Sequence, residues 1–184
     1  MAKHDGAGRR VFSSVRLTSR QHPNELTRIL VGMPTTHVRR RIAAPRSRVY
    51  RALLDPTAIT QWKVPDGMTL QVHQFEAREG GAIRISLTYD SPSGTGKTGA
   101  HTDTYHGRFA RLIPEELIVE VDEFETDDPA LRGEMTITIS LADAADGTDL
   151  VATHEGLPVG VSPADNEIGW NMALDKLAAL VTGH

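Results

Sequence analysis

The sequence predicts an α+β domain of the helix-grip type, in which one curved antiparallel sheet wraps around a long C-terminal helix. Three observations support this fold class. Six strand-like segments follow one another at hairpin-like separations, one apolar-striped helix closes the chain, and 39% of the 184 residues are hydrophobic. A sheet with one wet face must bury its other face, and this helix is the available cover.

The first part of the domain predicts one strand and two short helices. Thr36–Ile42 is the strand, and the Ala-Ala-Pro that follows ends it. Because proline suits the first turn of a helix, Arg46–Leu54 is expected to be helical, with its apolar side chains at helical spacing. An Asp-Pro pair breaks that helix, and Thr57–Trp62 is the second one.

The middle of the chain predicts a run of antiparallel strands. Their expected positions are about 68–76, 82–90, 101–113, 116–124, 133–142 and 148–155. In the second of them Ile83, Ile85, Leu87 and Tyr89 alternate with polar side chains, which is typical of a strand with one buried face. Glycine- or proline-containing turns separate most of the strands, and the Gly/Ser/Thr-rich stretch 91–99 is expected to be a flexible loop.

One long helix ends the chain. Ser162 is a natural N-cap and Pro163 fits the first turn, while Gly183 is a plausible stop. Apolar side chains follow at steps of four, three and four residues, which is the spacing of one helical face. They are Trp170, Leu174, Leu177 and Val181.

Residues 1–34 differ in composition from the rest of the chain. They carry six basic and two acidic side chains, whereas residues 35–184 carry 14 basic and 22 acidic ones. The segment lacks sustained periodicity, and its low hydrophobic content disfavours ordering. It is expected to be a disordered tail, or a mis-annotated extension translated upstream of a true start at Met33, which leaves a single functional domain at 35–184.

Composition and motifs exclude several functions. The chain has no cysteine, which excludes disulfides and thiolate metal sites and fits a reducing, cytoplasmic location. No run reaches the roughly 18 apolar residues of a membrane span, and a net charge of −4 is not that of a nucleic-acid binder. Because no three metal ligands converge in the pattern, neither a metal nor another cofactor is expected.

Several short motifs resemble those of a known family. In chain order they are Ile42-Ala-Ala-Pro-Arg-Ser-Arg-Val-Tyr-Arg-Ala-Leu-Leu-Asp-Pro56 with Trp62, Phe75-Glu-Ala-Arg-Glu-Gly-Gly81, Tyr105-His-Gly-Arg-Phe109, Asp146-Gly-Thr-Asp-Leu150, His154-Glu-Gly156, and Gly169-Trp170. Together they resemble the START-like (SRPBCC) superfamily, and within it the branch named after the activator of the heat-shock-protein-90 ATPase. The chain departs from that family at Glu76, where aspartate is usual, and residues 1–34 have no counterpart.

The resemblance implies a hydrophobic cavity between the long helix and the curved sheet, which other members of the superfamily use for lipids, hormones and polyketides. The eukaryotic chaperone activator needs a separate N-terminal domain that has no counterpart here, so the resemblance does not predict chaperone activation.

Strand parity and the helical stripe give a set of cavity-lining candidates. They are Trp62, Ile85, Leu87, Tyr89, His101, Asp103, Tyr105, Phe109, His154, Trp170 and Leu174. His101 and Asp103 lie two apart on one strand face and so form a candidate acid–base pair, but an exposed position at the strand start is an equally open interpretation. His154 at a rim, and both tryptophans in plain core packing, are alternatives of the same kind. Gly107, on the same strand face, is expected to mark the place where the long helix crosses the sheet closely.

The leading hypothesis is therefore a domain that binds a small hydrophobic or amphipathic ligand without a cofactor. An enzyme resembling the cyclases or dehydratases of the superfamily, using the same cavity, is the first alternative, and two polar candidates within hydrogen-bond reach inside the cavity would favour it. A co-chaperone or other interaction module is the second alternative, and it predicts an exposed apolar patch. The sequence leaves open whether the protein is a monomer or a homodimer.

Overall fold

The computed structural model describes residues 34–183, which form one domain of seven strands and three helices. In chain order the elements are β1 (Thr36–Ile42), α2 (Arg46–Leu53), α3 (Pro56–Trp62), β2 (Met68–Phe75), β3 (Ala82–Tyr89), β4 (Thr102–Ile113), β5 (Leu117–Phe124), β6 (Met135–Ala144), β7 (Gly147–Glu155) and α4 (Pro163–Thr182). Apart from Pro34, the segment predicted to be an N-terminal extension lies outside the described residues.

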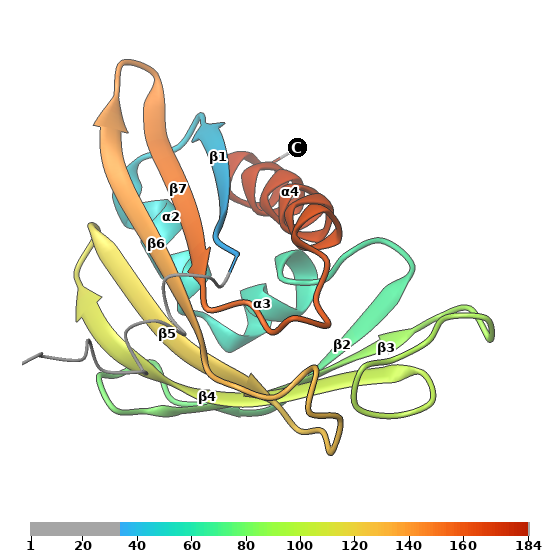
Figure 1. Ribbon diagram of the computed structural model, residues 1–184. Helices are drawn as coiled ribbons and strands as arrows, with labels where there is room; N and C mark the ends of the chain where they lie inside the picture. Colours follow the sequence, from blue (N-terminus) through green and yellow to red (C-terminus); the bar gives the residue numbers. More distant parts are fainter. Residues whose placement is uncertain (1–33, 184) are drawn as a thin grey trace, which may run out of the picture. The chain divides into compact units, whose positions relative to one another are not determined.

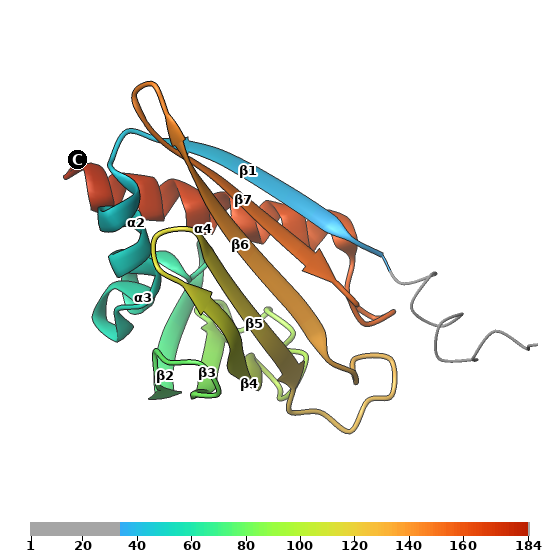
Figure 2. The ribbon, with the colours of Figure 1, turned by 90° about the vertical axis from the view of Figure 1, so that its left-hand side faces the viewer.

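The seven strands form one antiparallel sheet in the order β1-β7-β6-β5-β4-β3-β2. Consecutive strands from β2 to β7 are neighbours, and β1 pairs with β7 along its whole length. Figure 1 shows the sheet as a curved wall with α3 and α4 on its concave side. In Figure 2, which views the sheet from outside, α4 runs behind β1 and β7. The predicted helix-grip fold is confirmed.

The helix ends follow from local chemistry. The Asp55 side chain accepts hydrogen bonds from the backbone of Thr57 and Ala58, so α3 begins with its free amides satisfied. The predicted cap of α4 is confirmed, because the Ser162 hydroxyl accepts from the Asp165 backbone at 3.2 Å. The predicted stop is confirmed as well: Gly183 has a φ of 78°, a left-handed conformation that glycine adopts without steric cost.

The strand boundaries agree with the predicted ones to within two residues. The largest difference is at β6, predicted at 133–142 and found at Met135–Ala144. Gly133 has a φ of 118°, so the chain is still turning there. At the other end, the Asp-Gly turn is tight enough for Ala144 to pair with Gly147, which lengthens the strand.

The core fills the half of the concave face that lies under α2, α3 and the C-terminal part of α4. Leu174 and Leu177 of α4 are fully buried, and they face a layer of fully buried sheet side chains. That layer includes Ile83, Ile85, Phe109, Ile139 and Leu150. Fully burying such side chains contributes roughly 1.5–3 kcal/mol each, so the core fixes the position of the helix against the sheet.

Gly107 does mark a close approach, but the approaching element differs from the predicted one. A Cβ atom at this position would lie 2.0 Å from Oδ1 of Asp122 and 2.3 Å from the carbonyl oxygen of Val121, both on the neighbouring strand β5. The sequence-based expectation that α4 crosses here was therefore wrong. A glycine is required because β5 brings a buried carboxyl and a backbone oxygen against β4.

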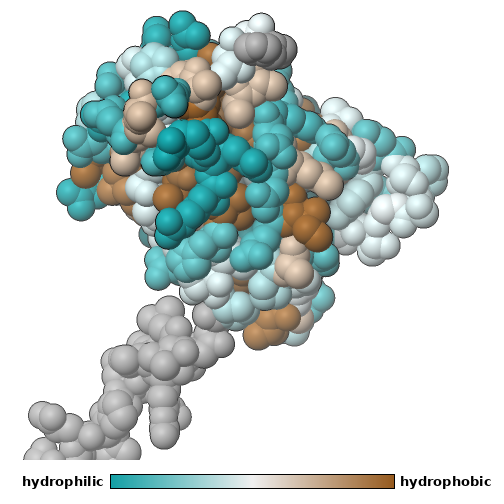
Figure 3. All heavy atoms as spheres, turned by 90° about the horizontal axis from the view of Figure 1, so that it is seen from above, coloured by the Kyte–Doolittle hydropathy of each residue, from teal (hydrophilic) through white to brown (hydrophobic). Residues whose placement is uncertain are grey.

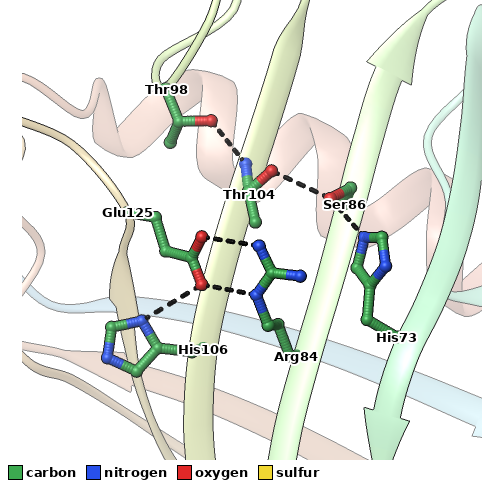
Figure 4. A network of polar contacts seen from close by, with 7 residues as sticks. All are labelled: His73, Arg84, Ser86, Thr98, Thr104, His106 and Glu125. Carbon is green, nitrogen blue, oxygen red and sulfur yellow. Dashed lines mark hydrogen bonds and ion pairs between the residues drawn. The ribbon is translucent and has the colours of Figure 1, made fainter.

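The outer face of the sheet is polar. Arg84 makes two hydrogen bonds of 2.7 and 2.8 Å to the Glu125 carboxylate, and His106 lies 3.6 Å from the same group. Ser86 and Thr104 share a hydrogen bond across β3 and β4. Figure 4 shows these contacts with α4 behind the sheet, on the opposite side.

Candidate functional site

A cavity of about 540 Å³ occupies the part of the concave face that the core does not fill. Its walls come from strands β3 to β7, from the segments 63–68, 95–97 and 160–162, and from the first half of α4. Apolar side chains form much of the lining, among them Met68, Leu87, Phe124, Met135, Ile137 and Val161.

Six of the predicted candidates line this cavity. They are Leu87, Tyr89, Asp103, Tyr105, His154 and Trp170. The five strand residues among them have the inward parity inferred from the alternation on their strands. The sixth, Trp170, belongs to the apolar stripe of α4. Their placement supports the parity assigned to β3, β4 and β7.

The other five candidates lie elsewhere. Four are core residues, with exposed fractions of 1% or less, namely Trp62, Ile85, Phe109 and Leu174. Ile85 and Phe109 have the predicted inward parity but lie further along their strands. Trp62 and Leu174 pack in the same core, where α2, α3 and α4 close over the sheet. His101 is exposed and precedes β4, which begins at Thr102, so strand parity does not govern it. Its Nδ1–H donates to the carbonyl of Gly94 in the loop.

Asp103 is buried and has a partner other than the predicted one. Lys97, in the Gly/Ser/Thr-rich loop, donates to the Asp103 carboxylate from both its backbone amide and its side-chain ammonium, each at 2.5 Å. The same ammonium lies 5.7 Å from the ring centre of Phe124. Asp103 therefore anchors the loop beside the cavity, and the sequence-based pairing of Asp103 with His101 does not form.

A buried ion pair lies at the base of the cavity. Lys63, directly after α3, places its ammonium 2.5 Å from the carboxylate of Glu120 on β5, and both side chains are at most 7% exposed. Burial lowers the pKa of Lys63, but the negative charge of Glu120, which also accepts a hydrogen bond from the ammonium, outweighs this effect and raises the pKa above the ordinary range. Lys63 therefore carries a fixed positive charge, and the carboxylate of Glu120 already neutralises it.

Asp122 is the least satisfied group on the cavity wall. It lies two residues after Glu120 on the same strand face, is 1% exposed, and neither of its carboxyl oxygens has a hydrogen-bond partner. Burial and the nearby Glu120 raise its pKa to about 8, against a smaller opposing effect of Lys63. At neutral pH this carboxyl is mainly protonated, so it can donate as well as accept a hydrogen bond.

Tyr105 lies next to this group. Burial raises the pKa of the Tyr105 phenol, and the carboxyls of Asp122 and Glu120 raise it further, although Lys63 opposes them. The phenol therefore stays neutral throughout the physiological range.

His154 faces the cavity in a defined tautomer. The side-chain amide nitrogen of Asn166 on α4 donates to Oγ1 of Thr36 at 2.8 Å and to Nδ1 of His154 at 2.7 Å. With Nδ1 accepting, the neutral ring carries its proton on Nε2, and this buried N–H has no partner. Burial lowers the pKa of His154 to about 4, with a smaller contribution in the same direction from Lys63. The ring packs edge-on against Trp170 at 4.5 Å.

The acid–base candidates do not pair with one another. Within residues 34–183 no hydrogen bond joins any two of His101, Asp103, Tyr105 and His154. In the same range no group of three histidine or acidic side chains is arranged to hold a metal ion.

Several polar residues of the cavity were not among the sequence-based candidates, and they include Lys63, Lys97, Asp122 and Asn166. Lys63 and Asn166 carry no motif that distinguishes them from surface residues. The inward position of Asp122 follows from that of Phe109 only through the register of β4 with β5, which the sequence alone does not give.

These features define a class of protein: a START-like helix-grip domain with a cavity between its sheet and its C-terminal helix. The family described as activator of Hsp90 ATPase homolog 1-like protein matches residues 43–182. The chain belongs to that family, and the resemblance seen in its sequence motifs is confirmed.

Solved structures agree with this assignment. A protein from Chromobacterium violaceum, CV1439, is 37% identical, with a TM-score of 0.72 over 80% of this chain and 96% of that one. A protein from Rhodobacter sphaeroides has a TM-score of 0.67 at 21% identity, covering 81% of this chain and 92% of its own. An AHSA1-like protein from Aeromonas hydrophila has a TM-score of 0.61 at 18% identity, with coverages of 82% and 93%. The last two show the fold alone.

No curated protein matches the chain closely enough to count as a relative. Among the helices of residues 34–183, none combines the length and the apolar character that crossing a membrane requires.

Proposed function

We propose that this domain binds a small hydrophobic or amphipathic molecule in the cavity between the sheet and α4. The size of the cavity supports this, since about 540 Å³ lies within the roughly 300–1,000 Å³ that small-molecule sites occupy. Its composition does so too, because a mostly apolar lining with a few placed polar groups is the usual make-up of such sites.

The observation that carries the proposal is the pair of unsatisfied groups on the wall. Asp122 and Nε2 of His154 are buried and have no protein partner. Leaving a polar group in this state costs on the order of 1–3 kcal/mol in a protein, and native structures contain few such groups. A bound molecule that hydrogen-bonds to them would recover that cost.

The surface offers less support for an interaction module. Among the described residues, the exposed large apolar side chains are Val159 and Ile168, and Ile168 itself lines the cavity. Figure 3 shows one face of the molecule as largely hydrophilic, with separated apolar areas. Two apolar side chains at or near a cavity rim fit the entry of a ligand better than the docking of a protein.

A pair of neighbouring substitutions tests the proposal. Leu87 lines the cavity, whereas Thr88 is exposed on the outer face of the same strand. Leu87→Trp should fill the cavity and weaken binding of the neutral fluorescent probe Nile red by about tenfold or more, which corresponds to about 1.4 kcal/mol. Thr88→Trp is the matched control and should leave the affinity unchanged. Equal affinities for both variants, or no Nile red binding by the unmodified protein, would refute the proposal.

Catalysis in the same cavity is a second candidate function. The observation in its favour is Asp122, a carboxyl that stays protonated near neutral pH inside a cavity, as general acids do. Native mass spectrometry of protein purified from its source would identify a bound molecule. Recovery of that molecule unchanged after incubation with fresh protein supports binding, and its conversion into a product supports catalysis.

A further inference from the structure

The chemistry of the cavity wall also restricts the polar end of its occupant. This inference rests on the proposed function, because it concerns the same cavity. Two polar groups without a hydrogen-bond partner line the cavity, the carboxyl of Asp122 and Nε2–H of His154, and they lie on different strands. His154 on β7 pairs with Ile137 of β6, and Asp122 on β5 pairs with Met135 of β6, so one strand separates the two residues.

Each of these groups can form a hydrogen bond with an oxygen atom of a ligand. Nε2–H of His154 is a donor and needs an acceptor, since its other ring nitrogen already accepts from Asn166. The protonated carboxyl of Asp122 both donates and accepts. A hydroxyl or a carbonyl oxygen can accept a hydrogen bond from Nε2–H of His154. The same two groups can also pair with the Asp122 carboxyl. A pure hydrocarbon would leave both unpaired.

The charges that face Asp122 disfavour a charged ligand. From its own strand the neighbour is Glu120, from the segment after α3 it is Lys63, and from β4 it is the neutral phenol of Tyr105. Glu120 and Lys63 already neutralise each other at 2.5 Å. Further along the wall, Lys97 is likewise paired with Asp103.

A charged group entering this region would find no free counter-ion among these pairs. An ammonium would lie beside Lys63 and a carboxylate beside Glu120, so either ion would meet a like charge. Burying an ion without a partner costs several kcal/mol, so an uncharged polar end is favoured.

We propose that the occupant of the cavity is an uncharged amphiphile, with an apolar body along Leu87, Ile137 and Trp170 and a hydroxyl or carbonyl oxygen at its polar end, bound by Nε2–H of His154 or by the carboxyl of Asp122. The class includes long-chain alcohols, aldehydes and ketones. It excludes fatty acids and amines as preferred ligands.

The test compares molecules that share one chain and differ in the polar end. Dodecanol, dodecylamine and dodecanoate compete at pH 6.5 with Nile red bound to the full-length protein. Dodecanol should displace the probe at a concentration at least about tenfold lower than the other two, which corresponds to about 1.4 kcal/mol. Stronger displacement by dodecylamine would overturn the inference and assign Asp122 as a counter-ion, and equal displacement by all three would also overturn it.

Two substitutions of one residue complete the test. Asp122→Asn keeps a neutral group that donates and accepts, and should retain the affinity for dodecanol, whereas Asp122→Leu should weaken it about tenfold. Loss of dodecanol binding in Asp122→Asn, with Nile red binding intact, would contradict the inference. If Nile red fails to bind even the unmodified protein, the proposed function itself fails, so the two failures are distinguishable.

Discussion

Asp122 should make the stability of the domain depend on pH in an unusual direction. The pKa of this carboxyl is about 8 in the folded protein, compared with an ordinary value of 3.8. Between these two values the folded state holds a proton that the unfolded state has released. The contribution of Asp122 to stability is therefore fully present below about pH 4 and is lost as the pH rises towards 8. Most aspartates act in the opposite sense, because their folded-state pKa is lowered.

The size of the effect follows from the pKa difference. Each pH unit between the two pKa values changes the free energy of unfolding by about 1.4 kcal/mol for one proton. Asp122→Asn replaces the carboxyl with a neutral group of the same shape and removes this dependence. Between pH 5 and pH 7 the stability of the variant relative to the unmodified protein should rise by about 3 kcal/mol.

Chemical denaturation at pH 5, 6, 7 and 8, followed by tryptophan fluorescence, measures this difference. The titration of His154 is common to both proteins and largely cancels in the comparison. Glu116→Gln is the matched control, because Glu116 is an exposed carboxyl in the turn before β5, and it should show no such trend. A stability difference between Asp122→Asn and the unmodified protein that stays constant with pH would refute the reasoning, since it would mean that Asp122 is ionised throughout.

Three further experiments test the architecture by chemical denaturation. Lys63→Met should destabilise the protein by about 3–5 kcal/mol by leaving Glu120 buried and unpaired, and adding Glu120→Leu should restore most of the loss; a double variant no better than the single one would contradict this. Gly107→Ala should cost about 1–3 kcal/mol as overpacking against β5, and an unchanged midpoint would contradict the close approach. Leu177→Ala should cost about 2–5 kcal/mol without changing Nile red affinity per folded molecule, and weaker binding would place Leu177 in the site.

The fold was largely predictable from the sequence, because period-two alternation and helix caps are local signals. Ile83 and Ile85 alternate with polar side chains and are buried as the pattern predicts. Ser162 and Gly183 mark the ends of α4 through backbone hydrogen bonding and a left-handed turn, and both effects act within a few residues. Such signals need no knowledge of the partner strand.

The extent of the cavity was not predictable, because parity gives the face of a strand and not the position along it. Ile85 and Leu87 share one face of β3, yet Ile85 is core and Leu87 lines the cavity. Phe109 and Tyr105 on β4 differ in the same way. Where the core ends depends on how far α2 and α3 reach over the sheet, which is a tertiary property.

The polar groups of the cavity were hidden for a related reason. In β5 the side chains on the concave face include Glu120 and Asp122, while Val119 and Val121 alternate with them. A pattern of this kind favours valines inside and carboxylates outside, the reverse of what the register gives. The compensating charge, Lys63, comes from a segment 57 residues away. Only the folded structure brings the two together.

Isotope-edited NMR of the labelled protein with unlabelled dodecanol tests directly whether a small amphiphile binds between α4 and the sheet. Intermolecular nuclear Overhauser effects are expected from the alkyl chain to the methyl groups of Leu87 and Ile137 and to the Trp170 ring. A second hollow lies beside Leu180 and Val181 at the end of α4, and contacts confined to it would contradict binding between α4 and the sheet. A complete absence of contacts at saturating dodecanol would contradict it as well.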